Sequence, residues 1–178
     1  MKRSIVVISR RCILCNNNYN DYKVEINMNW NAQEMDVYIQ QKEYIDTLVV
    51  PFVSVQVEPD RMKASASASD FLMYLSRFIE AQFKGRMVFT PPMTFTKSVD
   101  LPTFARQVAE DFKESAFKHT FFLTTDASLA HLEIDGVTVV WLPSIPIESM
   151  EPNLKQSIME DQLRQVLPVF TEKWSSAN

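Results

Sequence analysis

Apolar residues follow two different spacings along the chain, one typical of helices and one typical of strands. Helical spacing predicts four helices: 31–44, 69–85, one that opens at Asp100 and one that starts near Pro152. Nearly continuous apolar runs predict four buried strands: 46–57, 86–92, 119–126 and 137–143. The alternation of the two predicts an α/β fold, with a mainly parallel four-stranded sheet and helices on both faces, a Rossmann-like three-layer arrangement.

Three details of these elements depend on single residues. Asp135-Gly136 is typical of a hairpin turn and would make the last strand antiparallel, whereas one helical turn in the same connection would leave it parallel. Pro51 has no N–H to donate, which favours a bulge or a place at the sheet edge. Ser67 or Ser69 is expected to cap the second helix.

The first 27 residues differ from the rest in pattern and in charge. They carry five basic and two acidic residues, a net charge of +3, and the remainder carries 13 basic and 20 acidic residues, a net charge of −7. The segment 23–26 can be encoded by a purine-rich string that resembles a ribosome-binding site just upstream of Met28. We expect one α/β domain at 28–178. Residues 1–27 are then an extension, either disordered or upstream of the true start at Met28.

The composition argues against several classes of protein. A domain with a net charge of −7 is unsuited to binding the phosphate backbone of nucleic acid. Only two glycines are present, which argues against glycine-rich phosphate loops. No apolar run approaches the roughly 18–20 residues that span a membrane, and the apolar stretch within 2–9 is too short for a signal peptide. We therefore expect a cytoplasmic protein without a transmembrane segment.

Motifs of known chemistry are absent from the sequence. Cys12 and Cys15 could form half a zinc site or a redox pair, but His119 and His131 are distant and the flanking residues are polar, which favours an incidental pair. The sequence contains no P-loop, dinucleotide fingerprint, H-E-x-x-H or G-x-S-x-G motif. We predict neither a catalytic set nor a metal site, and the cofactor stays unknown.

Hydroxyl groups and charges gather where the predicted strands end. Ligands of open parallel sheets usually bind beyond the carboxyl ends of the strands. The candidate ligand-binding residues are Lys63, Ser65, Ser67, Ser69, Thr94, Thr124, Thr125, Asp126 and Ser144. The segment 63–69 lies just before a predicted helix, where free N–H groups attract anions. The alternative is structural: the serines cap the helix and Asp126 caps a turn, and such caps are commoner than anion sites.

Several separate segments resemble the YpiF family of Firmicutes, a family of unknown function. They are QQKEYIDTLVVPFVSV, FKGRMVFTPPMTF, KHTFFLTTD and WLPSIPIESM, and the resemblance extends over about residues 28–174. The family brings no established activity, cofactor or catalytic residue. The resemblance implies a small cytoplasmic protein of spore-forming bacteria and their relatives, whose gene can lie beside those of the menaquinol–cytochrome c reductase.

Two functions are compatible with these observations. The favoured one is an accessory domain that binds another protein, and a component of that respiratory complex is one candidate. The alternative is a binding module or enzyme for a small anionic ligand, phosphorylated or nucleotide-like, with its site at the carboxyl ends of the strands. An exposed apolar patch would favour the first function, and a closed polar pocket would favour the second.

Overall fold

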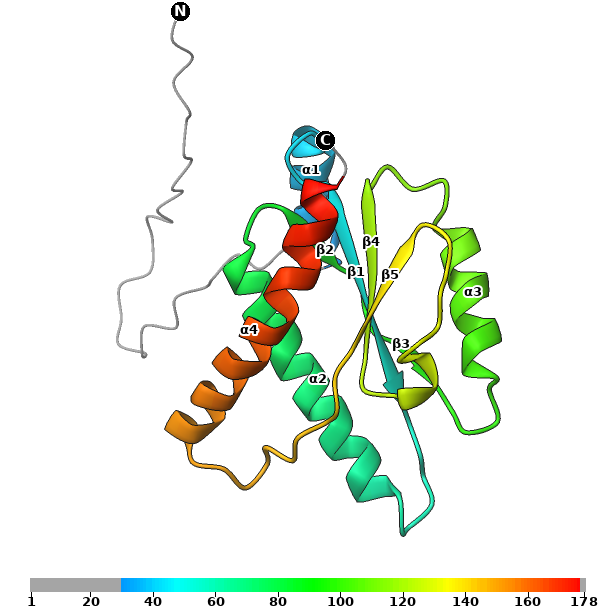
Figure 1. The fold of residues 1–178 in the computed structure, drawn as a ribbon, viewed down its shortest axis with the longest axis vertical. Coiled ribbons are helices and arrows are strands. Elements are labelled where there is room, and N and C mark those ends of the chain that lie inside the picture. Colours follow the sequence, from blue (N-terminus) through cyan, green and yellow to red (C-terminus); the bar gives the residue numbers. More distant parts are fainter. Residues whose placement is uncertain (1–29, 177–178) are drawn as a thin grey trace, which may run out of the picture.

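A parallel sheet of five strands forms the centre of the structure, a computed structural model that describes residues 30–176 (Figure 1). The strands are β1 (Thr47–Ser54), β2 (Met87–Phe89), β3 (Met93–Phe95), β4 (His119–Thr124) and β5 (Val137–Trp141). Their order is β2-β1-β4-β5, and β3 continues the β2 side by pairing with the second half of β1. The expected start at Met28 and the Cys12–Cys15 pair lie outside the described residues. The predicted α/β class is confirmed.

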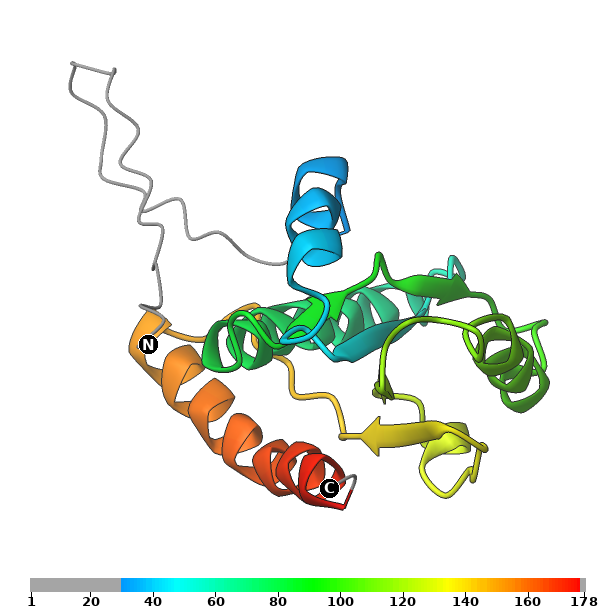
Figure 2. The ribbon, with the colours of Figure 1, turned by 90° about the horizontal axis from the view of Figure 1, so that it is seen from above.

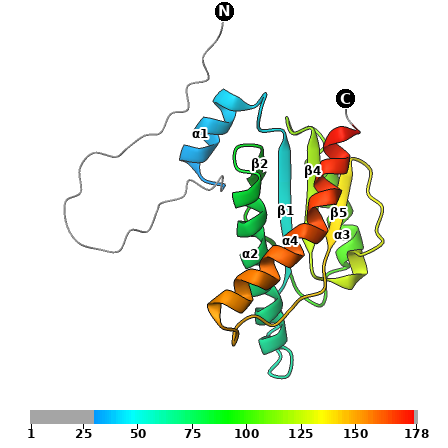
Figure 3. The same cartoon turned by 60° about the vertical axis from the view of Figure 1, so that its left-hand side comes forward.

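Helices cover both faces of the sheet. They are α1 (Ala32–Gln41), α2 (Met62–Gln82), α3 (Leu101–Asp111) and α4 (Pro152–Ser175), with a short 3-10 turn, η1 (Ala127–Leu129). Helices α2 and α4 lie against each other over one face (Figure 3). Helix α3 covers the other face (Figure 2), where η1 and the inner side of α1 also join the core.

The two faces of the sheet have separate apolar cores. On the α2–α4 face, Phe71, Phe121 and Phe170 are fully buried, and on the α3 face Phe52 and Phe122 are. Alternate residues of the strands point to opposite faces, so consecutive Phe121 and Phe122 enter different cores. Burial of each ring contributes about 1.5–3 kcal/mol. A sheet that is apolar on both faces explains the continuous apolar runs of the sequence.

Pro51 lies in the middle of the sheet, so a place at the sheet edge is the wrong prediction. Backbone groups of odd-numbered β1 residues face β2 and β3: the Val49 carbonyl accepts from Thr90 N–H, and Val55 N–H donates to the Phe95 carbonyl. The missing donor of Pro51 therefore faces the gap between β2 and β3. Val49 pairs with Phe89 but Phe52 pairs with Met93, so the extra residue lies in the neighbouring strand. Pro51 does mark an irregularity, but β1 itself is regular against β4.

The number of strands and the direction of the last one differ from the simplest prediction. The segment predicted as one strand, 86–92, contains β2, then Thr90 and two prolines, and β3 resumes the pairing with β1 directly after the prolines. Strand β5 is parallel to β4. Gly136 does make a tight turn, with φ of +75°, but the turn gives a single antiparallel bridge between Ile134 and Val137. Because η1 supplies a helical turn in this connection, β5 returns in the parallel direction.

Helix α2 begins seven residues earlier than the sequence predicts. It starts at Met62, and Arg61 at its N-cap makes no side-chain capping bond. Ser67 and Ser69 are therefore helical residues and cap nothing. Alanine alternates with serine over 64–69, and alanine is the best helix former, which allows the helix to extend through this small-residue segment.

Candidate functional site

A crevice lies at the carboxyl ends of β1 and β4. Its volume is about 290 Å³, and it is lined by Ser54, Gln56, Arg61, Ala64, Ser65, Ala68, Thr125, Asp126 and Ser144. After β1 the chain passes through α2 to β2 on one side, and after β4 it passes through η1 to β5 on the other side. The crevice therefore occupies the switch point of the sheet, where ligands of open α/β folds usually bind.

Four of the predicted site residues meet in this crevice, and five do not. Ser65, Thr125, Asp126 and Ser144 line it. The other five, which do not line it, are Lys63, Ser67, Ser69, Thr94 and Thr124. The Thr124 side chain is fully buried, and its hydroxyl accepts from Asp126 N–H at 3.1 Å. Thr94 lies on β3, beyond β1 from the crevice.

Two of the four residues that do meet there have structural partners. The Ser65 hydroxyl donates to the Ser54 carbonyl at 2.7 Å and accepts from Gln56 N–H at 3.0 Å, which ties α2 to the end of β1. One Asp126 oxygen accepts from both the N–H and the hydroxyl of Ser128, at 2.9 and 2.6 Å, and so caps η1. The Asp126 contacts agree with the structural alternative that the sequence left open for that residue, whereas no serine caps the start of α2.

An acidic side chain of the protein itself lies beside the predicted anion segment. Ser67 donates to the Glu148 carboxylate at 2.9 Å. The pKa of Glu148 is lowered, first by hydrogen bonding to its own backbone, then by Ser67 and by the charges of Lys63 and Lys155. Glu148 therefore supplies at Ser67 the negative charge that the sequence assigned to a ligand.

The crevice also contains residues that sequence reasoning missed. Arg61 lines it and has no carboxylate within ion-pair distance in the part of the chain that the structure describes. Gln56 also lines the crevice, with its side-chain amide 3.4 Å from the Ser54 hydroxyl. A free guanidinium can hold a carboxylate or phosphate through paired hydrogen bonds. Both residues could have been predicted from their position in the sequence, because they lie in the connection that follows the carboxyl end of β1.

Four exposed apolar side chains lie on two segments of the chain that follow the carboxyl ends of β1 and β3. Val55, Val57 and Met62 are 40, 71 and 50% exposed, and Val99 is 37% exposed. Val55 and Val57 lie on the connection from β1 to α2, Met62 is the first residue of α2, and Val99 lies on the connection from β3 to α3. An ion pair between Glu58 and Lys97 joins the two connections. We call these four side chains the carboxyl-end rim. The connection from β1 to α2 carries both crevice residues and rim residues, so the rim and the crevice lie at the same end of the sheet.

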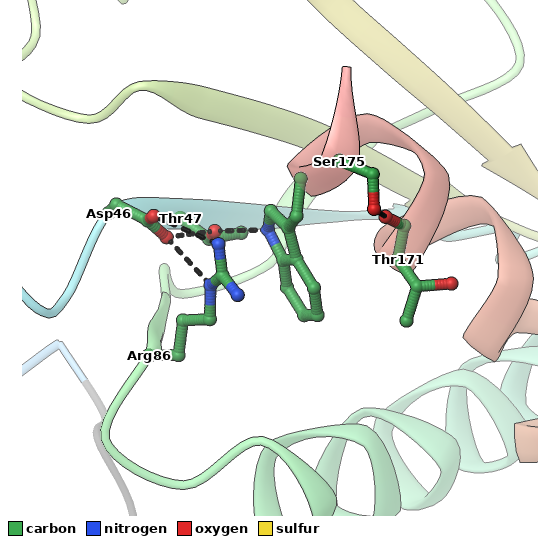
Figure 4. Close-up of polar contacts among 6 residues, drawn as sticks. Asp46, Thr47, Arg86, Thr171 and Ser175 are labelled. Atoms are coloured by element: carbon green, nitrogen blue, oxygen red, sulfur yellow. Dashed lines mark hydrogen bonds and ion pairs between the residues drawn. The ribbon is translucent and has the colours of Figure 1, made fainter. Parts of the chain in front are cut away.

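A different polar network lies at the amino end of the sheet (Figure 4). Arg86 contacts both oxygens of Asp46, at 3.2 and 3.1 Å, and its guanidinium carbon lies 3.9 Å from the Trp174 ring centre. The Trp174 indole N–H donates to the Thr47 hydroxyl at 2.9 Å, and that hydroxyl donates to Asp46 at 2.8 Å. The network joins the last turn of α4 to the first residue of β1, which is a structural role.

Neither a metal centre nor a membrane-spanning helix is found among residues 30–176. Over residues 30–176, no three histidine, cysteine, aspartate or glutamate side chains gather as they would around a metal ion. Within the same range, no helix has both the length and the apolar character required to cross a bilayer.

The fold and the crevice define the protein as an open-sheet α/β domain. A family model described as "Protein of unknown function (DUF2487)" matches residues 36–174. The uncharacterized protein YpiF of Bacillus subtilis (strain 168) is 32% identical over 152 residues, which cover 84% of this chain and 99% of that protein. The chain therefore belongs to the DUF2487 family and is similar to YpiF, so the predicted resemblance is confirmed. No solved structure matches significantly.

Proposed function

We propose that this protein is an accessory domain that binds another protein through the carboxyl-end rim. The observation that carries the proposal is the exposure of the four rim side chains, Val55, Val57, Met62 and Val99, on two segments that the Glu58–Lys97 ion pair joins. Apolar side chains that cluster at a surface usually mark a binding site, whereas single ones do not. The neighbouring crevice offers Arg61 as a polar anchor of the kind that is enriched at interfaces.

The arrangement of charged groups supports binding more than catalysis. Both histidines lie away from the crevice: His119 begins β4 at the opposite end, and His131 follows η1. Asp126 is engaged with Ser128, and Ser65 with the backbone of β1. The crevice thus offers a guanidinium, an amide and hydroxyl groups. These hold a partner's polar groups without needing to move protons.

A component of the menaquinol–cytochrome c reductase is the specific partner that we propose. The gene association implied by the family resemblance supports this assignment. It also requires the protein to act on the cytoplasmic side, as the sequence leads us to expect.

Affinity capture with matched variants tests the proposal. A tagged chain expressed in Bacillus subtilis and crosslinked in cells should recover a defined protein. Val57→Asp should reduce that recovery at least tenfold, because it places a charge in an apolar contact. Ile39→Asp is the control, since Ile39 is also apolar and is 64% exposed but lies on α1.

Two outcomes would count against the proposal. Recovery of no specific protein, or equal recovery with Val57→Asp and the parent chain, would remove the rim as the contact surface. A specific partner that is sensitive to Val57→Asp but is no reductase subunit would retain the interaction function and reject the respiratory link.

A second candidate function is a small-ligand site in the crevice, favoured by its position at the switch point. A phosphorylated or carboxylate ligand would pair with Arg61. A thermal-shift panel of nucleotides and sugar phosphates should then show stabilisation that Arg61→Ala abolishes. A ligand at a hundred times its dissociation constant adds about 2.7 kcal/mol. A panel without any shift would leave protein binding as the proposed function.

A further inference from the structure

Two hollows lie next to each other at the amino end of the sheet, at the opposite end from the crevice. One has a volume of about 350 Å³ and lies between β1, β4 and the last turn of α4. The other, about 490 Å³, lies between the first residues of β4 and β5 and also reaches α4. They share Lys118 and His119 in their walls. Figures 1 and 3 show the carboxyl end of α4 beside the amino ends of these strands.

Positive charge at these hollows is only partly compensated. In the smaller one, Arg86 is paired with Asp46. Lys118 and Lys173, which line the larger one, have no carboxylate within 4.0 Å among residues 30–176. Asp135 also lines the larger hollow. Its side chain is 93% exposed, and its carboxylate lies 3.9 Å from the Lys113 ammonium group. Two lysines without a paired carboxylate therefore line the same hollow, in a domain whose net charge is −7.

His119 shows that these charges converge. Burial lowers the pKa of its imidazole; the charges of Arg86, Lys118 and Lys173 lower it further, and Asp46 opposes them. Both lysines thus act on one point although they are 55 positions apart in sequence. At neutral pH the imidazole is uncharged and can donate or accept a hydrogen bond beside the two ammonium groups.

The balance of charge selects the class of ligand. A single carboxylate would leave one of the two lysines uncompensated. A phosphate group carries a charge of about −1.5 to −2 at pH 7 and offers three acceptor oxygens. We propose that Lys118, Lys173 and His119 form a binding site for the phosphate group of a small phosphorylated molecule. This site is independent of the rim and of the crevice.

Pyrophosphate is the probe for this site. Pyrophosphate is titrated into the full chain in a calorimeter, at a constant ionic strength set with sodium chloride. The heats should show saturable binding. Lys118→Ala and Lys173→Ala should each weaken that binding at least tenfold. Both lysines are exposed, so the variants should fold like the parent chain, which circular dichroism checks.

Lys155→Ala is the matched control. Lys155 lies in the first turn of α4, the helix that carries Lys173, and 18 residues of helix separate the two by roughly 27 Å. This variant should bind pyrophosphate like the parent chain. Three results would overturn the proposal: no saturable binding, an equal loss with Lys155→Ala, or a loss with Arg61→Ala that Lys118→Ala does not share. The last would place the anion in the crevice.

Discussion

Arg86 shows how one side chain can hold two distant parts of the chain together. It lies between the Asp46 carboxylate and the Trp174 ring, so it joins the start of β1 to the end of α4. Burial alone would raise the pKa of the Asp46 carboxyl. The hydrogen bonds from Arg86 and Thr47, helped by the charge of Arg86 and by that of His119 in its protonated form, outweigh burial and lower that pKa. The ionised form of Asp46 is therefore stabilised in the folded state.

Replacing Arg86 by alanine should destabilise the domain by about 1–3 kcal/mol. A partly exposed ion pair contributes up to about 1 kcal/mol and a cation–π contact about 0.5–2 kcal/mol. Urea denaturation at pH 7 measures the change in free energy of unfolding. Arg106→Ala is the control, since Arg106 is exposed on α3 and should change stability by less than about 0.5 kcal/mol.

The same variant makes a prediction about pH. Because the pKa of Asp46 is lower in the folded state, its ionisation stabilises the fold at pH values above the unfolded pKa of about 3.9. That contribution is lost as the pH falls through the folded pKa. The difference between the parent chain and Arg86→Ala should therefore shrink below about pH 4, leaving the contact with Trp174. A constant difference from pH 7 to pH 3 would show that Asp46 plays no part.

For individual residues, the sequence predicted positions in the fold but not interaction partners. It identified Ser65 and Asp126 as polar residues at strand ends, and both lie in the crevice. It could not assign their partners, because Ser65 bonds the backbone 11 residues away and the carboxylate at Ser67 comes from Glu148, 81 residues away. The sequence offered no reason to group Lys118 with Lys173, because they line one hollow only when α4 is packed beside the start of β4.

Among the elements, β1 is the one on which the sheet depends. It pairs with β2, β3 and β4, and its irregular side faces the break between β2 and β3. Proline is tolerated at position 51 because its missing donor faces that break. The position, rather than the residue type alone, decides the cost of a proline in this strand.

Moving the proline within β1 tests this explanation. Pro51→Val should change the free energy of unfolding by no more than about 1 kcal/mol, mainly through greater freedom of the unfolded chain. Val49→Pro should cost more than about 2 kcal/mol, because Val49 is fully buried and pairs with Phe89 on β2. Thermal denaturation of both variants measures the contrast. Equal costs would mean that the break between β2 and β3 does not explain Pro51.

Most elements of the fold were predictable, including the short β2 within 86–92 and α1 within 31–44, whereas β3 and the start of α2 were not. The apolar periodicity located α3 and α4 and the three longer strands, because each buries a regular face. Strand β3 has only three residues and follows two prolines, so no periodic pattern could show it. The start of α2 was missed because alanine and serine carry little apolar signal.

At the scale of the whole molecule, the two ends of the sheet have different chemistry. The carboxyl end combines the apolar rim with a crevice that contains Arg61, whereas the amino end combines two lysines with a neutral histidine. Helix α4 spans the distance between them, from the loop that carries Glu148 to the indole of Trp174. A protein partner at one end and a phosphate group at the other could therefore bind at the same time.

Site-specific photo-crosslinking tests the central claim most directly. A photoreactive amino acid replaces Val57 in one chain and Ile39 in another, both expressed in Bacillus subtilis and irradiated in living cells. The account predicts one defined crosslinked product from position 57 and none of the same mass from position 39. No product from position 57, or the same product from both positions, would contradict the claim that the carboxyl-end rim is the surface that binds a partner.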